Sequence, residues 1–151
     1  MTFRQFPKRE QLKKRSRGER IISRIMTYPK ALKKADIASA LYVRTRDEGK
    51  PCISCGSTGR KLQCGHFIPR AYMIFRYDER NINGQCMHCN YTLEGNHDNY
   101  GKALAKLYGQ EFVDYMEREK HKHRKYNVNE LLLLTDYFTR KTAELKKMES
   151  V

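Results

Sequence analysis

Two pairs of cysteines, each separated by two residues, set the chemistry that this sequence can do. Cys52 and Cys55 form the first pair, and Cys86 and Cys89 form the second. A Cys-x-x-Cys knuckle points both sulfurs the same way, so two knuckles can fill the tetrahedral shell of one zinc ion. Five cysteines, an odd number, suit metal ligation in a reducing compartment better than a disulfide framework. The spacing therefore predicts a structural Zn²⁺ held by four thiolates.

The segment between the two cysteine pairs is long enough to hold more than a metal clip. Its 30 residues include Gly65-His66-Phe67, and Asn90 follows the second pair at once. Phosphodiester hydrolysis needs a base that activates water and a cation that stabilises the charged phosphorane. A histidine with its usual pKa of about 6.5 is mostly neutral at pH 7, so His66 suits the first task. Asn90 could present an oxygen to Mg²⁺ or Mn²⁺, and Asn81 could orient the imidazole.

Each of these side chains also has a simpler interpretation. His66 could replace a cysteine on the zinc or form a hydrogen bond within the core. Asn81 could close the turn before the second cysteine pair, and Asn90 could be a hydrogen bonder at a helix start. The fifth cysteine, Cys64, is expected to be a buried apolar side chain. Because Gly65 precedes the histidine, a second ligand for a hard cation is unassigned, and the candidates are Asp78, His97 and Asp98.

Charge is distributed unevenly along the chain. The formal net charge is +14, from 31 Lys and Arg against 17 Asp and Glu. Residues 1–34 hold twelve basic and two acidic side chains, whereas residues 35–116, which contain the cysteines, hold ten and nine. A nearly neutral centre with basic flanks predicts a polyanionic partner, and nucleic acid is the expected one. The basic amino-terminal run could instead be a solvated charged tail.

Apolar periodicity predicts helices on both sides of the cysteine region. Apolar residues recur at three- and four-residue intervals from Leu32 to Tyr42, which indicates a helix ending near Asp47. A final helix is predicted over residues 129–147, with Asn127 or Asn129 as its cap. The remaining predicted elements are a short strand at residues 61–64, a helix at 86–93, and helical pieces at 100–107 and 111–119.

We therefore expect an α+β protein in which a small zinc-stapled core is flanked by helices. Three regions are predicted: a basic helical arm over residues 1–34, a zinc-binding core over residues 35–116, and a carboxy-terminal helix over residues 117–151. The sequence has no apolar run of 18 residues and no apolar signal segment at its start. We accordingly expect a cytoplasmic protein with no membrane partner.

His66, Asn81 and Asn90 resemble the HNH group of ββα-metal nucleases, in the variant whose third residue is asparagine. Phage endonuclease VII is similar in having a four-cysteine zinc followed immediately by asparagine. A closer resemblance is to the lambdoid phage NinG family, which includes the Rap recombination nuclease. It covers about residues 33–110 and rests on these segments in order: residues 42–47, 51–56, 65–68, 76–81 and 85–90, then Gly95-Asn96, Tyr100 and Tyr108-Gly109.

The resemblance implies a structure-specific endonuclease with a ββα-metal core that cuts branched DNA, such as Holliday junctions and D-loops, during phage recombination. It implies His66 as the general base and Mg²⁺ or Mn²⁺ as the catalytic cation, with Asn90 and Asp78 as candidate ligands. The wider HNH pattern has an acidic residue before the histidine, whereas Gly65 fits the NinG family. Candidate contacts to DNA phosphates are Arg44, Arg46, Arg70 and Arg76.

A four-way junction is resolved by paired nicks, so we expect a homodimer, with the long terminal helices as its interface. Two other functions stay open. The chain could be a non-catalytic zinc module that binds DNA in recombination or transcription, with His66 in a structural role. It could also be a nuclease of RNA or of unbranched DNA, with the same chemistry on another substrate.

Overall fold

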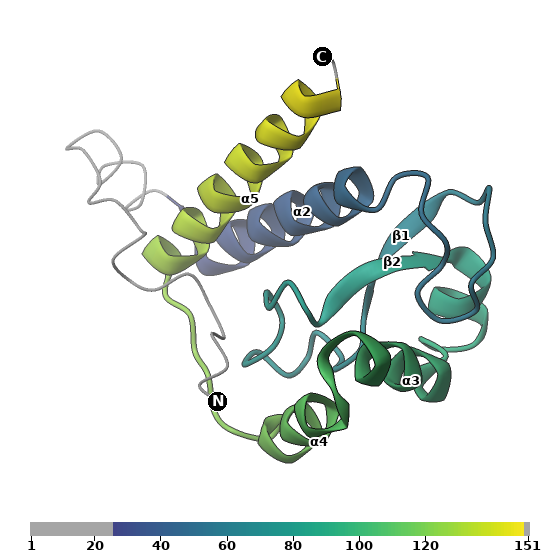
Figure 1. Ribbon diagram of the computed structural model, residues 1–151. Helices are drawn as coiled ribbons and strands as arrows, with labels where there is room; N and C mark the ends of the chain where they lie inside the picture. Colours follow the sequence, from purple (N-terminus) through teal and green to yellow (C-terminus); the bar gives the residue numbers. More distant parts are fainter. Residues whose placement is uncertain (1–25, 150–151) are drawn as a thin grey trace. The chain divides into compact units, whose positions relative to one another are not determined.

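The computed structural model describes residues 26–149 (Figure 1), so most of the predicted basic arm, residues 1–25, lies outside the described residues. The described elements mix helices with a two-stranded sheet, which confirms the α+β class. Within residues 26–149, no helix is long and apolar enough to span a membrane. In chain order the elements are α2 (Tyr28–Arg46), β1 (Leu62–His66), β2 (Ile82–Cys86), the π-helix η2 (His88–Thr92), α3 (His97–Tyr108), α4 (Gln110–Glu119) and α5 (Val128–Glu149).

The described chain forms two compact units, which differ from the predicted regions. One unit contains residues 26–42 and 126–149, and the other contains residues 43–125. The predicted boundary after residue 34 falls inside α2, and the one after residue 116 falls inside α4. The apolar pattern of each helix continues across these points, whereas the predicted boundaries followed a change in charge.

The first unit pairs α2 with α5. Buried residues of α2 recur as Ala31, Ala35, Ala38 and Tyr42, which confirms the predicted helical stripe, although Leu41 is 40% exposed. The Tyr42 ring lies against the Phe138 ring of α5, with centroids 5.5 Å apart. This aromatic pair supplies apolar contact area between the two helices.

Asn127 is the cap of α5. Its Oδ1 accepts a hydrogen bond from the Glu130 backbone N–H at 2.9 Å, and Glu130 Oε2 accepts one from the Asn127 N–H at 2.9 Å. This reciprocal capping box satisfies two donors that would otherwise have no partner at the helix start. Of the two predicted caps, Asn127 and Asn129, the structure therefore has Asn127.

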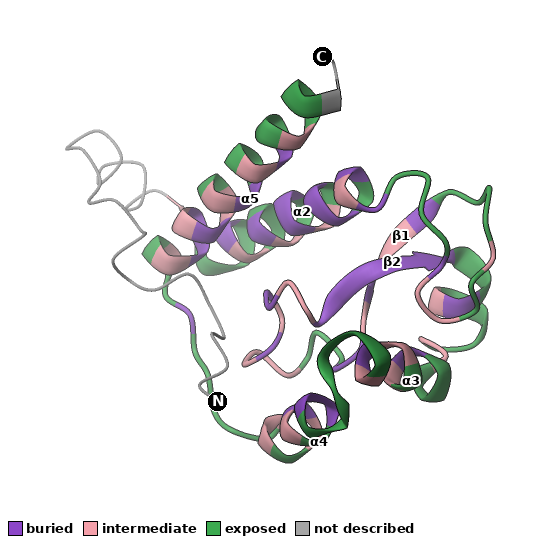
Figure 2. Ribbon diagram, viewed as in Figure 1, coloured by how far each residue is buried: buried purple, intermediate pink, exposed green. Residues whose placement is uncertain are grey.

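In the second unit, β1 and β2 form an antiparallel hairpin. The register places Leu62 opposite Cys86, Gly65 opposite Asn83 and His66 opposite Ile82. All five residues of β2 are buried (Figure 2). The predicted strand is confirmed, but the predicted helix at residues 86–93 starts later, because Cys86 is the last residue of β2. Strand pairing of Cys86 holds its backbone beside the first knuckle, where its N–H donates to Cys52 Sγ at 3.3 Å.

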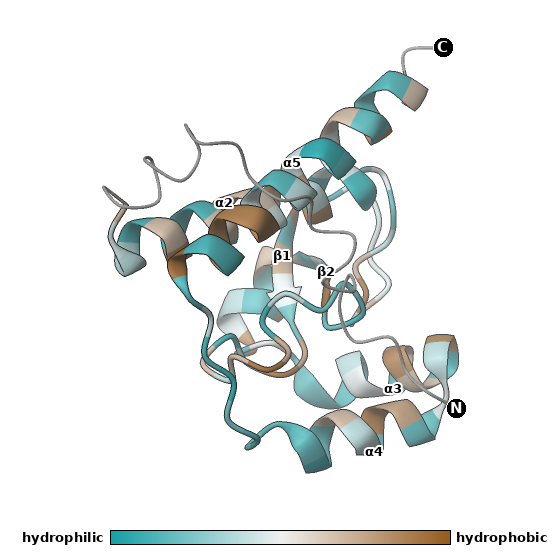
Figure 3. Cartoon of the chain, turned by 90° about the vertical axis from the view of Figure 1, so that its left-hand side faces the viewer, coloured by the Kyte–Doolittle hydropathy of each residue, from teal (hydrophilic) through white to brown (hydrophobic). Residues whose placement is uncertain are grey.

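Helices α3 and α4 pack against each other and complete the core of the second unit. Along both helices hydrophobic residues alternate with hydrophilic ones (Figure 3), as expected for elements with one buried face. Gly109, at a φ of +89°, separates them, between the two helical pieces that the sequence predicted. The fully buried residues of this core include Phe75, Ile82, Tyr100, Leu104, Phe112 and Met116.

Arg46 and Asp47 fasten the end of α2 to the hairpin. Arg46 donates two hydrogen bonds to the Asp47 carboxylate, at 2.9 and 2.6 Å, and others to Ile82 O at 2.9 Å and Asn83 Oδ1 at 3.1 Å. Asp47 Oδ2 also accepts from the Gly84 N–H at 2.9 Å. Burial raises the pKa of Asp47, but the bonds and charge of Arg46 outweigh it and hold that pKa below its usual value.

We expect Asp47→Ala to lower the free energy of unfolding by about 3 kcal/mol, because it removes the carboxylate that balances the partly buried Arg46 charge and the acceptor of the Gly84 N–H. Since folding lowers the pKa of Asp47, this stabilisation is complete above about pH 4 and is lost as the pH falls through the folded-state pKa. Urea denaturation of zinc-saturated protein measures it. Asp136→Ala is the matched control, because the Asp136–Arg140 pair is about half exposed and should contribute under about 0.5 kcal/mol. Equal losses in the two variants would contradict this role.

Candidate functional site

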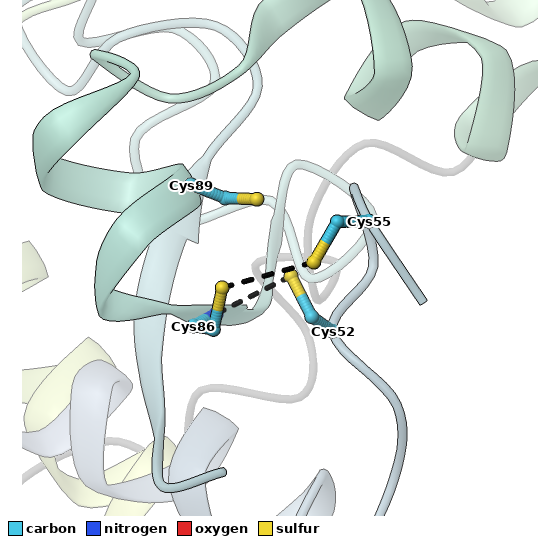
Figure 4. Close-up of side chains that lie close together, drawn as sticks. All are labelled: Cys52, Cys55, Cys86 and Cys89. Carbon is cyan, nitrogen blue, oxygen red and sulfur yellow. Dashed lines mark hydrogen bonds between the residues drawn. The ribbon is translucent and has the colours of Figure 1, made fainter. Parts of the chain in front are cut away.

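The four cysteines predicted from their spacing come together in the second unit. Their Sγ atoms all lie within 4.8 Å of one another, and Cys55 Sγ is 3.8 Å from Cys86 Sγ (Figure 4). Zn–S bonds of about 2.3 Å in a tetrahedron place neighbouring sulfurs about 3.8 Å apart. The cluster of Cys52, Cys55, Cys86 and Cys89 therefore fits one structural zinc ion. Cys64 lies outside it, half-buried on β1.

Hydrogen-bond donors surround the sulfurs. Ser57 Oγ lies 3.2 Å from Cys55 Sγ, and Asn96 Nδ2 donates to Cys89 Sγ at 3.3 Å. The Ser57 contacts lower the pKa of the Cys55 thiol to about 6, whereas burial raises the pKa of Cys89 to about 12. Asn96 reaches Cys89 because its backbone is left-handed, at a φ of 44°, a conformation that asparagine tolerates. Such donors stabilise thiolates and orient them for a metal.

Gln85 braces the two knuckles, a role that the sequence analysis missed. This side chain is fully buried, and its Nε2 donates to Ser54 Oγ at 2.6 Å and to Gly95 O at 2.7 Å. Ser54 lies inside the first knuckle, and Gly95 follows η2, so one amide joins both segments that carry cysteines. Its Oε1 lies where a side chain of residue 65 would begin, only 2.0 Å from an ideal Cβ on Gly65. The glycine before His66 is therefore required by the packing of Gln85.

We expect Gly65→Ala to destabilise the protein by about 2 kcal/mol or more, because the new methyl group overlaps a buried amide that cannot move freely. Urea denaturation compares it with Gln85→Ala and with the double variant. In the Gln85→Ala background the overlap is gone, so the same Gly65→Ala change should cost less than about 1 kcal/mol. Equal costs in the two backgrounds would show that the pair is not coupled.

His66 ends β1, with its ring half-buried. Its Nε2 lies 3.2 Å from the backbone oxygen of Arg76. A carbonyl oxygen can only accept, so Nε2 carries the proton of the neutral ring, and Nδ1 is the basic nitrogen. The four sulfurs fill a zinc shell by themselves, so His66 is not needed as a zinc ligand. The contact holds the imidazole in one orientation, as a general base requires.

Asn81 is fully buried, and its side chain joins backbone segments of the long loop between the strands. Oδ1 accepts from the Ile68 N–H at 2.7 Å, and Nδ2 donates to Ile68 O and Phe75 O, both at 3.0 Å. The Asn81 backbone oxygen accepts from the Phe67 N–H at 3.0 Å, next to His66. These contacts make Asn81 a positioning residue for the segment that follows His66.

Tyr100 is a second buried organiser that sequence reasoning did not identify as a site residue. Its hydroxyl lies 3.2 Å from Gly65 O, 3.1 Å from Asn81 O and 3.1 Å from the Nδ2 donor of Asn83. Burial raises the pKa of Tyr100, so the hydroxyl keeps its proton and serves as a donor. This one group ties α3 to the backbone on both sides of His66. An isolated tyrosine in a helix gave no signal of that role.

Asn90 lies on η2, directly after the cluster cysteine Cys89. Its Nδ2 donates to Gln63 Oε1 on β1 at 2.9 Å. Within residues 26–149, the Asn90 side chain makes this hydrogen bond through its nitrogen, and its Oδ1 accepts no hydrogen bond. The contact fixes the one-turn helix η2 against the strand that carries His66. π-helical turns are frequent at functional sites.

The three other candidates for a cation ligand have different surroundings. Asp78 is buried, and Arg80 donates to both of its oxygens, at 3.0 and 2.7 Å. His97 pairs with Glu117 at 3.1 Å and stacks on Phe67, whereas Asp98 is exposed in the first turn of α3. Asp78 thus holds the loop through an ion pair, and the structure gives no support to its predicted role as a cation ligand.

The predicted DNA-contacting arginines also separate into two kinds. Arg46 is held by the Asp47 network described above, which suits a structural role rather than a phosphate contact. Arg76 donates to Arg70 O at 2.6 Å, and Arg70 is exposed.

Arg44 is exposed on the last turn of α2 and lines a pocket of about 660 Å³. The full lining of this pocket is Arg44, Arg60, Lys61, Leu62, Gln63 and Met87.

Comparison with known proteins gives one consistent result. The family model described as Bacteriophage Lambda NinG protein matches residues 3–149. Over 121 residues the chain is 36% identical to Protein ninG of Escherichia phage 933W, 34% to that of Escherichia phage lambda and 33% to that of Salmonella phage P22. Each alignment covers 79% of this chain and 59 to 60% of the relative, so the chain spans about three-fifths of the length of these relatives. No solved structure is significantly similar.

Proposed function

Since the chain belongs to the NinG family of bacteriophage proteins, we propose that it is a structure-specific endonuclease that cuts branched DNA during phage recombination, within the host cytoplasm. The observation that carries the proposal is the position of His66 at the end of β1, where a backbone carbonyl orients it through Nε2. In the sequence it lies between the two cysteine pairs of a cluster that fits zinc, and Asn90 follows the second pair directly. A hairpin followed by a short helix, with these residue types in this order, resembles the arrangement of an HNH nuclease and supports the proposal.

In this proposal His66 takes a proton from the attacking water, through the nitrogen that does not face Arg76. Asn81 and Tyr100 keep the backbone around His66 in place, and the zinc cluster holds η2 against the hairpin. A zinc ion held by these four sulfurs would have a full ligand shell, so its role would be structural and not chemical.

A hard cation, Mg²⁺ or Mn²⁺, would stabilise charge on the phosphorane and on the leaving oxygen. The hydrogen bond from Asn90 Nδ2 to Gln63 Oε1 holds these two amides side by side across η2 and β1, and hard cations accept amide oxygens as ligands. Gly65 offers no carboxylate, and Gln85 occupies the space beside it. Asn90 and Gln63 would therefore form a neutral donor set, with the DNA phosphate supplying the negative charge.

Because this donor set has no carboxylate to hold a hard cation, it also favours a second candidate function. In that alternative the protein is a non-catalytic zinc module that binds DNA. The discriminating experiment incubates zinc-loaded protein with a labelled four-way junction and with a linear duplex of the same sequence. Nicking of the junction that needs Mg²⁺ or Mn²⁺ supports the nuclease. Tight binding to the junction without cleavage in either cation supports the module. Equal cleavage of the two DNAs would remove the branched-DNA part of the proposal.

Paired nicks across a junction need two active sites, so we expect the nuclease to act as a homodimer. Sedimentation equilibrium at micromolar concentration should give twice the chain mass of 17.9 kDa. A monomer that still cuts both strands symmetrically would contradict this expectation.

A further inference from the structure

The pocket on the hairpin side of the cysteine cluster has a marked charge bias. Arg44, Arg60 and Lys61 are all exposed and line it, and none of its lining residues is acidic. These side chains come from the end of α2 and from the segment just before β1. Three cations around one pocket of about 660 Å³ favour a ligand with more than one negative charge in a row, such as the backbone of a DNA strand.

Large apolar side chains are exposed on and next to η2. Met87 lines the pocket and is 63% exposed, and Tyr91 on η2 is 78% exposed. Met87, Asn90 and Tyr91 are three and four residues apart, so they lie on one side of the helical turn. That side faces the pocket, because Asn90 donates to Gln63, which is itself part of the lining. An aromatic ring that is so exposed contributes little to the fold.

From this juxtaposition we infer that the pocket and the exposed side of η2 bind an unstacked nucleotide of a DNA strand, with phosphates on Arg44, Arg60 and Lys61 and the base on Tyr91. Base stacking on an aromatic ring, beside a basic groove, is how single-stranded nucleic acid is held without sequence preference. In an intact duplex the bases are stacked on each other and unavailable to Tyr91.

The inference rests on the proposed function and specifies how the protein would prefer branched DNA. At a branch point bases are less well stacked than within a duplex arm, so their transfer onto Tyr91 costs less. The phosphate contacts can form with any DNA, whereas the stacking contact can form only with DNA that has an unstacked base. Affinity for duplex should therefore depend on the cations alone, and the added affinity for a junction should depend on Tyr91.

Fluorescence anisotropy tests this division, with a fluorescein-labelled four-way junction and a linear duplex of the same sequence, without added Mg²⁺ or Mn²⁺. Tyr91→Ala should weaken junction binding about tenfold and change duplex binding less than twofold. Tyr91→Phe, which keeps the ring, should bind the junction like the wild type. Arg60→Ala with Lys61→Ala should weaken both DNAs and reduce the slope of log affinity against log salt by about one to two.

Leu107→Ala is the matched control, because Leu107 is also a large exposed apolar residue, at 58%, but lies on α3 and outside the pocket lining. It should leave binding to both DNAs unchanged. Wild-type affinity of Tyr91→Ala for the junction, or an equal loss for junction and duplex, would overturn the inference and reassign this face of η2 to a protein partner. Because these assays measure binding, they distinguish that failure from a failure of the nuclease proposal, which would appear as absent cleavage.

Discussion

Removal of zinc is expected to unfold residues 43–125. Binding of a structural zinc is coupled to folding and contributes on the order of 10 kcal/mol in small domains, which is comparable with the whole stability of a typical domain. The cluster joins the first knuckle, the end of β2 and η2, and these segments contain few other large buried side chains. Cys86→Ser should accordingly lose both the metal and the folded state of this unit.

Metal content and folding can be measured together, by elemental analysis and by amide NMR spectra before and after chelation. The account predicts one zinc per chain and collapse of the dispersed resonances of residues 43–125 once zinc is removed. Cys64→Ser is the matched control, because Cys64 is a cysteine outside the cluster, and it should retain one zinc and the folded spectrum. A spectrum that stays dispersed without metal would contradict the structural role of zinc.

Zinc affinity should also rise with pH. The Cys55 thiol, with a pKa of about 6, is largely ionised at pH 7 before metal arrives, whereas Cys89, at about 12, is still protonated. Zinc binds thiolates, so it must release the Cys89 proton, and each released proton strengthens apparent affinity about tenfold per pH unit. Below about pH 6 Cys55 also has to lose a proton, so the dependence becomes steeper there. Competition with a chromophoric chelator at several pH values measures this slope.

The second large effect is expected at His66. General base catalysis contributes about 10² to 10⁴ in rate, so His66→Ala should slow junction cleavage by about that factor. The Arg76 carbonyl loses one hydrogen-bond partner, and the ring is only half-buried, so the variant should stay folded and keep its zinc. Single-turnover cleavage at saturating protein separates the chemical step from DNA binding.

His123→Ala is the matched control for this prediction, because His123 is an exposed histidine outside the hairpin and the cysteine cluster. It should cleave within about twofold of the wild type. A His66→Ala variant that cuts as fast as the wild type would assign the base to another group. If the His66→Ala variant lost both junction binding and cleavage, His66 would instead have a role in holding DNA.

The metal cluster and the helices could be predicted from the sequence because their signals are local. A Cys-x-x-Cys spacing already determines the direction of two sulfurs. Asn127 and Glu130 form the cap of α5 within one helical turn. The α2 stripe and the break at Gly109 follow from periodicity and from one glycine. The predicted helix at residues 86–93 began too early because β pairing with Leu62 retains Cys86 in a strand, and that partner lies 24 residues away.

Side-chain roles were harder to predict where the partner is distant in sequence. Arg46 looks like any exposed basic residue, yet its acceptors Ile82 O and Asn83 Oδ1 are 36 and 37 residues away. Asp78 differs, because its partner is local: Arg80, two residues on, donates to both of its carboxylate oxygens. Gln85 and Tyr100 belong to the segments that carry the family resemblance, but the sequence did not reveal their roles, because their buried partners come together only in the folded chain.

One cleavage assay tests the proposal that this protein cuts branched DNA through His66. Wild type and zinc-loaded His66→Ala protein are incubated with a labelled four-way junction, beside a linear duplex, in Mg²⁺ and in Mn²⁺. The account predicts nicks near the branch point that need the cation, spare the duplex and disappear in the variant. A wild-type protein that binds the junction tightly and leaves it uncut in both cations would contradict the claim.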